Sequence, residues 1–253
     1  MRSGHAATAV TPVLFAGVGA RDASGYPIRL ASFRLEQSDS GYAVLGIATP
    51  RARVTGTPGS TALIGLLSGR LAPAYGRLRV LDQDMTTAVG RAAARPQIGI
   101  AARGGRVWPT VTIRHLIERA ARRSGQKLYD RRLMVAAILD RMALMPWADV
   151  PLRSVPDLVS RRARLAAACV HEPSLLVIDG LLDHLPALDR SVLAGVVADL
   201  KRDMSIVAVG HDADTLLLCS DQLIVLADGI VLGRNAIPAP ALYSTRAAFG
   251  HLP

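Results

Sequence analysis

The chain has 253 residues, half of them hydrophobic, which is enough to bury one substantial core and a smaller lobe. No apolar run approaches the roughly 18–20 residues that a membrane-spanning helix needs, and the N-terminus lacks the pattern of a signal peptide. Two cysteines, Cys169 and Cys219, stand in apolar surroundings without metal-ligand spacing, which predicts small buried thiols in a reducing cytoplasm.

The formal net charge is +10, and nearly all of it is arginine, because Lys127 and Lys201 are the only lysines. Clustered arginines are typical of nucleic-acid surfaces. The aromatic content is only 4%, however, and the aromatic residues do not alternate with the arginines, so no platform for stacked bases is visible. We therefore favour solvated helix faces near anionic lipid headgroups or an acidic partner over a nucleic-acid surface. The clusters are Arg119, Arg122 and Arg123; Arg131 and Arg132; and Arg161, Arg162 and Arg164.

The first hundred residues are typical of strands and turns. Residues 33–38 and 42–48 are β-prone runs, separated by a turn cluster at 38–41. A glycine-rich loop then opens an apolar helix at 62–67, and a strand is predicted at 77–81.

Residues 110–170 change to helical spacing, with apolar side chains three and four positions apart. This spacing predicts helices at 112–123, 131–144 and 160–170. Pro146, Pro151 and Pro156 separate the second helix from the third.

After Pro173, two short β-branched runs each end at a polar residue. Residues 175–178 stop at Asp179, and residues 206–209 stop at Gly210 and His211. Runs of this kind are typical of strands buried on both faces, at the centre of a parallel sheet. Ligands of such sheets bind beyond the carboxyl ends of the strands, where Asp179 and His211 are expected. Asp212 and Asp214 are expected to cap a helix at 215–219, and residues 221–233 predict a strand, an Asp-Gly turn and a second strand.

Four segments follow one another in the order of known motifs: GTPGSTALIGLLSG (56–69), RPQIGIAARGGRVWPTVTIRHLI (95–117), SVPDLVSRRARLAAACVHEP (154–173) and LLVIDGLLDHLPALDR (175–190). In this order the chain resembles the ATPase subunits of ABC transporters over nearly its whole length, as a degenerate member. The resemblance implies an α/β, P-loop NTPase-like (RecA-like) core with an N-terminal β subdomain and an inserted helical subdomain. It implies three regions: residues 1–103, with a degenerate phosphate loop at 54–62; residues 104–170, the helical subdomain; and residues 171–253, with the rest of the core and a C-terminal tail.

The phosphate loop of this family reads G-x-x-x-x-G-K-[ST], in which lysine neutralises the β- and γ-phosphates and the hydroxyl binds Mg²⁺. The resemblance places Gly59 on the second glycine, Ser60 on the lysine and Thr61 on the Mg²⁺ ligand, with Val54 on the first glycine. Gly56 and Gly59 could still form an anion-binding nest. Without the lysine, we expect either a plain glycine turn with no cofactor, or ATP and Mg²⁺ bound weakly, with Thr61 and Asp179 as the metal ligands.

Other catalytic positions of the family also differ in this chain. Arg103 stands where a glutamine ligates Mg²⁺, and residues 155–159 read Val-Pro-Asp-Leu-Val where the family has the LSGGQ signature. At the Walker B position Asp179 is kept, but Gly180 replaces the glutamate that activates water; Asp183 is close enough in sequence to be considered as a base. His211 matches the switch histidine, so Asp179 and His211 are the candidate catalytic residues.

The resemblance, with these losses, implies a pseudo-ATPase that serves as a structural or regulatory subunit of a membrane transport complex. Its expected place is cytoplasmic, peripheral at the inner face of the membrane. Its expected partners are a permease that docks on the helical subdomain near residues 103–109, a second ATPase-like subunit and an anionic lipid surface. Two alternatives stay open: a divergent but active ATPase, and an interaction or nucleic-acid-associated module that reuses the fold.

Overall fold

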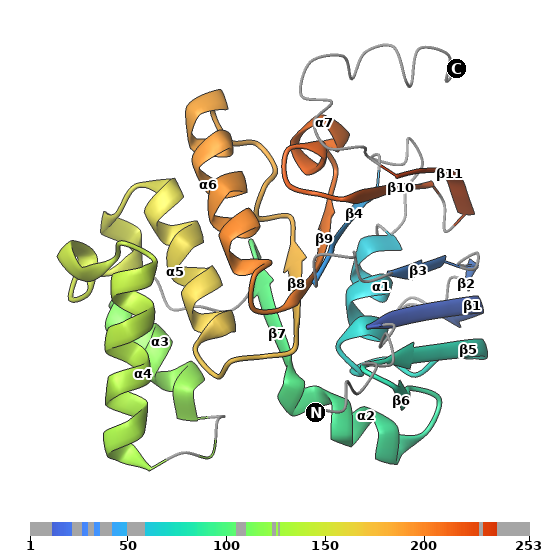
Figure 1. Ribbon diagram of the computed structural model, residues 1–253, viewed down its shortest axis with the longest axis horizontal. Coiled ribbons are helices and arrows are strands. Elements are labelled where there is room, and N and C mark those ends of the chain that lie inside the picture. The colour runs from blue at the N-terminus through green and yellow to red at the C-terminus, as the bar shows by residue number, and fades with distance from the viewer. Residues whose placement is uncertain are drawn as a thin grey trace, which may run out of the picture.

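A six-stranded sheet forms the centre of the computed structural model, which describes residues 12–21, 27–29, 33–35, 42–49, 59–104, 110–122, 125, 127–227 and 230–236 (Figure 1). Five strands run parallel, and the edge strand β11 is antiparallel to its neighbour. In spatial order the strands are β11 (Ile230–Ala236), β10 (Gln222–Ala227), β4 (Val44–Ala48), β9 (Ser205–Gly210), β8 (Leu175–Asp179) and β7 (Ile98–Ala102).

The strands β8 and β9 occupy the interior of this sheet, as their uninterrupted apolar sequences predict. Residues 175–178 and 205–210 are buried throughout, so both faces of these strands contact other layers of the protein. The two strands predicted within 221–233 are also confirmed, as the antiparallel pair β10 and β11, and the predicted Asp-Gly turn between them lies outside the described residues.

A second, antiparallel sheet lies at the N-terminal end of the chain. Its strands are β1 (Val13–Arg21), β2 (Pro27–Arg29), β3 (Phe33–Leu35), β5 (Tyr75–Val80) and β6 (Gln83–Asp84). The helix α1 (Gly59–Leu67) packs between the two sheets, with Leu63 and Leu66 in one buried cluster with Phe15 of β1 and Val177 of β8 (Figure 1). The runs at 33–38 and 42–48 are therefore not neighbours: β3 joins the small sheet and β4 joins the large one.

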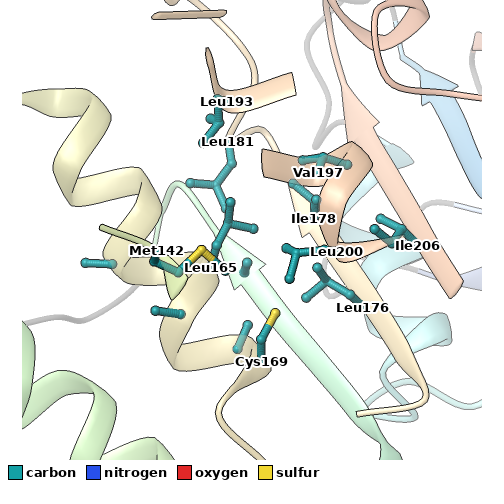
Figure 2. Close-up of a cluster of buried hydrophobic side chains, with 14 of the residues drawn as sticks. Met142, Leu165, Cys169, Leu176, Ile178, Leu181, Leu193, Val197, Leu200 and Ile206 are labelled. Atoms are coloured by element: carbon teal, nitrogen blue, oxygen red, sulfur yellow. The ribbon is translucent and has the colours of Figure 1, made fainter. Parts of the chain in front are cut away.

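Helices cover the other side of the large sheet. Within residues 104–170 lie α3 (Ile113–Ala121), α4 (Leu128–Arg141) and α5 (Asp157–Cys169), with 3-10 turns at Met145–Trp147 and Leu152–Ser154. Figure 2 shows the side chains of α5 and α6 (Ala187–Leu200) meeting those of β8 and β9 in one buried cluster. The remaining helices are α2 (Ala88–Ala94), the 3-10 turn Arg95–Gln97 and α7 (Ala213–Leu217).

Helix boundaries differ from the sequence prediction by a few residues. The helix α5 begins at Asp157 rather than at residue 160, because Pro156 has an extended backbone that can precede a first helical turn. The side chain of Asp212 caps α7 by accepting a hydrogen bond from the Asp214 backbone N–H at 3.2 Å, as predicted. Asp214 itself lies in the first turn of α7, where its charge favours the helix dipole.

Both cysteines are free thiols in the interior, as predicted. Burial raises the pKa of Cys169 and of Cys219 to about 12, so neither forms the reactive thiolate at neutral pH. Among the residues that the structure describes, no helix is long and apolar enough to cross a membrane.

Candidate functional site

Three loops meet at the carboxyl edge of the large sheet. In the parallel register, Asp179 at the end of β8 pairs with Val209 of β9, and Ala48 at the end of β4 pairs with Gly210. The structure therefore brings Asp179 and His211 to the same edge, beside the chain that leaves β4. Ligands of parallel sheets bind at this edge, as the sequence predicts for this chain.

His211 is held on two sides by its own chain. Its Nδ1 atom lies 2.7 Å from the carbonyl oxygen of Thr49, so Nδ1 carries the proton and donates. Its backbone N–H donates to Oδ1 of Asp183 at 2.9 Å. Thr49 in turn bonds Gly210, through its backbone N–H at 2.8 Å and its hydroxyl at 3.1 Å. The ring nitrogen left for a ligand is therefore Nε2.

The environment of Asp183 fits a structural role better than the role of a general base. The residue is only 3% exposed. Its carboxylate accepts from the His211 backbone and lies against two glycines: a Cβ atom would be 2.8 Å from Oδ1 at Gly210 and 3.5 Å from Oδ2 at Gly180. A carboxylate enclosed in this way has little access to a water that it could activate.

Asp179 is partly buried, and its protonation depends on its two neighbours. Burial raises its pKa above the ordinary value of 3.8, and the charge of Asp183 raises it further, whereas His211 lowers it. An ionised Asp179 is what Mg²⁺ requires, so this environment opposes metal binding. No group of three or more histidine, cysteine, aspartate or glutamate side chains in the described residues is arranged to hold a metal ion.

We expect the Asp179→Asn variant to be slightly more stable than the parent at neutral pH. The native pKa of Asp179 is raised, so the native state binds the proton more tightly than the unfolded state does. The parent therefore loses stability as pH rises from 3.8 through the native pKa, and the variant lacks this loss. The gain should stay below about 1 kcal/mol because the group is partly exposed. Urea unfolding across pH measures it; a gain that persists at low pH would contradict the assignment.

Gly180 directly follows Asp179 and has a left-handed backbone conformation, with φ +63°. Its backbone N–H donates to the carbonyl oxygen of Val209 at 2.9 Å. A residue with a side chain is strained there by about 1 kcal/mol. Position 180, where the resemblance implies a glutamate, therefore has a backbone conformation that favours glycine.

Arg103 directly follows β7, and its backbone N–H donates to the carbonyl oxygen of Asp179 at 2.9 Å. Its side chain is exposed beside the turn at Gly180, where a Cβ would lie 3.8 Å from the Cβ of Arg103. Next to it, Arg164 donates to the carbonyl of Ala102 at 3.3 Å, and burial lowers the pKa of Arg164. The guanidinium group of Arg103 thus occupies the position at which the resemblance implies a metal-ligating glutamine.

The prediction that the third arginine cluster is a solvated face is wrong for Arg161. The residue is 2% exposed, and its guanidinium bonds the backbone carbonyls of Leu181 and Asp183 at 2.5 and 2.7 Å. It also pairs with Oδ2 of Asp157, at 2.6 Å from Nη2. The burial follows from helical spacing, because Arg161 lies one turn before Leu165 and two turns before Cys169, which are both buried. In the other two clusters Arg119, Arg122 and Arg132 are exposed and Arg131 is partly buried, whereas Arg123 lies outside the described residues.

The phosphate-loop positions are only partly visible. Gly59 and Ser60 begin α1, and Thr61 is exposed on its first turn. Gly56 and Val54 lie outside the described residues. At the signature position, the carboxylate of Asp157 is bonded to Arg161 and Pro156 precedes the helix, so the helix start has no side-chain cap.

Sequence reasoning missed two residues of this site, Thr49 and Arg161. Thr49 carries no signal beyond its place at the end of a buried run. Arg161 does carry one, since Asp157 four residues earlier supplies a partner of opposite charge at helical spacing.

The curated proteins to which this chain is similar include ATP-binding proteins and other members of ABC transporters. No family model matches the chain. ABC transporter A family member 1 of Dictyostelium discoideum is 20% identical over 204 residues, which is 79% of this chain and 23% of that protein. An aliphatic sulfonates import ATP-binding protein, SsuB of Mycobacterium sp. (strain MCS), is 37% identical over 97 residues, covering 38% and 40%. A taurine import ATP-binding protein, TauB of Jannaschia sp. (strain CCS1), is 25% identical over 171 residues, covering 67% and 62%.

Solved structures agree at the level of the fold. cbiO1 of Clostridium perfringens, part of the ABC transporter complex cbiONQ, matches with a TM-score of 0.74 and 18% identity, over 90% of this chain and 89% of that one. The ADP conformation of an ATP-binding cassette of an ABC transporter matches with a TM-score of 0.72 and 15% identity, over 90% and 91%. The match spans less than two thirds of the length of each curated relative named above. The predicted fold class, that of the ABC ATPase domain, is confirmed.

Proposed function

Since the relatives of this chain are ABC transporter proteins and its fold is that of the ABC ATPase domain, we propose that it is an ATPase-like subunit of a membrane transport complex that does not hydrolyse ATP. Its role is structural or regulatory. The residues expected to activate water and to neutralise the phosphates are replaced, since Gly180 stands at the glutamate position and Ser60 at the lysine position.

One observation carries the proposal. The position after Asp179 is a glycine with a left-handed backbone conformation. The nearest other carboxylate in sequence is Asp183, which is buried and accepts a hydrogen bond from the His211 backbone N–H. Neither of the two positions considered for a general base beside Asp179, residue 180 and Asp183, is therefore suited to activate water. The absence of a lysine at position 60, and Asp157 at the signature position, point the same way.

The proposed partners follow from the relatives rather than from the geometry of this chain. Two relatives are import ATP-binding proteins by name. We propose that a membrane permease binds this chain through the helical region at 104–170, together with a second ATPase-like subunit. The proposed location is the cytoplasmic face of the membrane.

Thermal unfolding of the purified chain, titrated with Mg-ATP and Mg-ADP, tests whether the chain binds nucleotide at all. A ligand at about 100 times its Kd stabilises the native state by about 2.7 kcal/mol, which raises the midpoint of a chain of this size by roughly 5–10 °C. We expect no rise at millimolar nucleotide. A rise of that size would show a rebuilt nucleotide pocket.

The active-ATPase alternative has one observation in its favour, since Asp179 and His211 do converge at one edge. Phosphate release from ATP, compared between the parent and Asp179→Asn, decides between the two. Hydrolysis that the parent shows and Asp179→Asn loses would overturn the pseudo-ATPase. Asp189→Asn, a substitution in the first turn of α6, is the control for a general effect of removing one carboxylate.

A further inference from the structure

The first two turns of α4 expose large apolar side chains, although the helix also has a buried apolar face. Val135, Ile138 and Leu139 are buried against the helical lobe. Leu128, Tyr129 and Leu133 are 58%, 72% and 53% exposed, and Ala136 and Ala137 are exposed beyond them. A surface helix normally places polar residues on its solvent side. Three large apolar side chains within six residues therefore indicate a surface that meets something other than water.

Cations surround this apolar end of α4. The described cations of the α3–α4 connection and the helix ends beside it are Arg119, Arg122, Lys127, Arg131 and Arg132, against the two acids Glu118 and Asp130. None of these five cations has an ion pair within the described residues. The patch therefore has a net positive charge that its own surface does not neutralise.

The unpaired cations of α4 lie near its start. The cations lie at the start of the helix, whereas Asp140 lies seven residues after Leu133, about 10 Å further along the axis. Arg141, the last residue of the helix, is bonded to Asp199 and Asp203 at 3.2 and 2.6 Å. The end of α4 is thus joined to α6 and to the residues after it through Arg141, and its cation is neutralised there. The helical lobe that carries α4 lies at the left of Figure 1.

We propose that the tip formed by the end of α3 and the first two turns of α4 binds an anionic lipid surface. Tyrosine and leucine enter the interface between headgroups and acyl chains, where a tyrosine ring is favoured, and the arginines and Lys127 stay at the level of the phosphates. This surface is independent of the nucleotide edge, because it uses no residue of that site. An acidic protein face would bind the same cations, but binding to it would not involve inserting Tyr129 and Leu133 into a bilayer.

Co-flotation with vesicles tests this proposal. The full chain is mixed with vesicles of phosphatidylcholine alone, or of phosphatidylcholine and phosphatidylglycerol in equal parts. We expect binding to the second kind only, weaker as salt rises. Each cation near an anionic surface contributes about a fivefold factor in partitioning, so the double variant Arg122→Gln, Arg132→Gln should bind roughly 25-fold more weakly. The variant Tyr129→Ser, Leu133→Ser should lose binding with its charge unchanged.

Matched controls separate this patch from the net charge of the whole chain. Arg70→Gln with Arg153→Gln removes the same charge from exposed sites elsewhere, and Val89→Ser with Leu188→Ser removes apolar side chains that are 80% and 83% exposed. Both controls should bind as the parent does. Equal losses in the controls, binding to phosphatidylcholine alone, or no binding to either vesicle would each overturn the proposal, and the last would leave an acidic protein face as the partner to seek.

Discussion

Replacing Arg161 with methionine should lower the free energy of unfolding by about 3 kcal/mol, more than an ordinary surface substitution does. Methionine keeps the volume of the side chain but removes the donor that bonds the carbonyl oxygens of Leu181 and Asp183. Each buried acceptor left without a partner costs about 1–3 kcal/mol. The remaining partner, Asp157, is exposed and is solvated once released. Urea unfolding at neutral pH measures the loss.

Two variants of the same helix sharpen this result. Arg161→Lys keeps the charge but has a single ammonium group in place of the planar guanidinium, so it should recover only part of the stability. Arg162→Met is the matched control, since Arg162 is half-buried next to Arg161 and its Nε has no hydrogen-bond partner. We expect a loss below about 1 kcal/mol there. Equal losses at the two positions would show that the bonds to residues 181–183 contribute nothing specific.

The bonds of Arg161 also connect the helical lobe to the candidate site. From the first turn of α5 they reach the loop after β8, and through Asp183 they reach the backbone of His211 and hence Thr49. Loosening this connection should speed hydrogen exchange of the His211 amide more than that of amides within β8. The site is thus held by residues from three separate parts of the sequence.

The sequence predicts those features of the site that lie in one continuous segment. The buried run at 175–178 ends at Asp179 and the run at 206–209 ends at His211, and both strands lie where such runs belong, in the interior of a parallel sheet. Local patterns suffice here because two adjacent parallel strands bring their own carboxyl ends together. The order of motifs added the fold class, which the structural neighbours confirm.

Features that depend on distant partners were not predictable in this way. Arg161 stands in a run of arginines, and a charge run is usually solvated. Helical spacing places it on the buried side of α5, but the carbonyl oxygens that its guanidinium bonds lie in a loop twenty residues later. The separation of the runs at 33–38 and 42–48 into two sheets has the same cause, because β4 pairs with β9 and β10 from the end of the chain. Whether the degenerate motifs abolish hydrolysis stays a prediction for the measurement of phosphate release.

Replacing Gly210 with alanine should cost about 2 kcal/mol of stability, although the position is an ordinary strand end without positive φ. The new Cβ would lie 2.8 Å from Oδ1 of Asp183, and this oxygen cannot move away without losing the backbone N–H of His211. Either the carboxylate shifts and leaves a buried charge poorly bonded, or the strand end moves. Thermal and urea unfolding report the loss.

A double-mutant cycle shows whether this contact is the cause. Asp183→Ala alone removes the acceptor for His211 and should itself be destabilising, but it also removes the atom that Gly210→Ala would meet. The double variant should therefore lose less than the sum of the two single losses, with a coupling of about 1 kcal/mol or more. Gly195→Ala in α6 is the control, since a Cβ there meets nothing within 4 Å and alanine favours the helix by up to about 1 kcal/mol. Additive losses would mean that Gly210 is required for a reason other than Asp183. A coupled result would mean that the buried carboxylate and the glycine form one unit, which leaves Asp183 no freedom to act on a bound nucleotide.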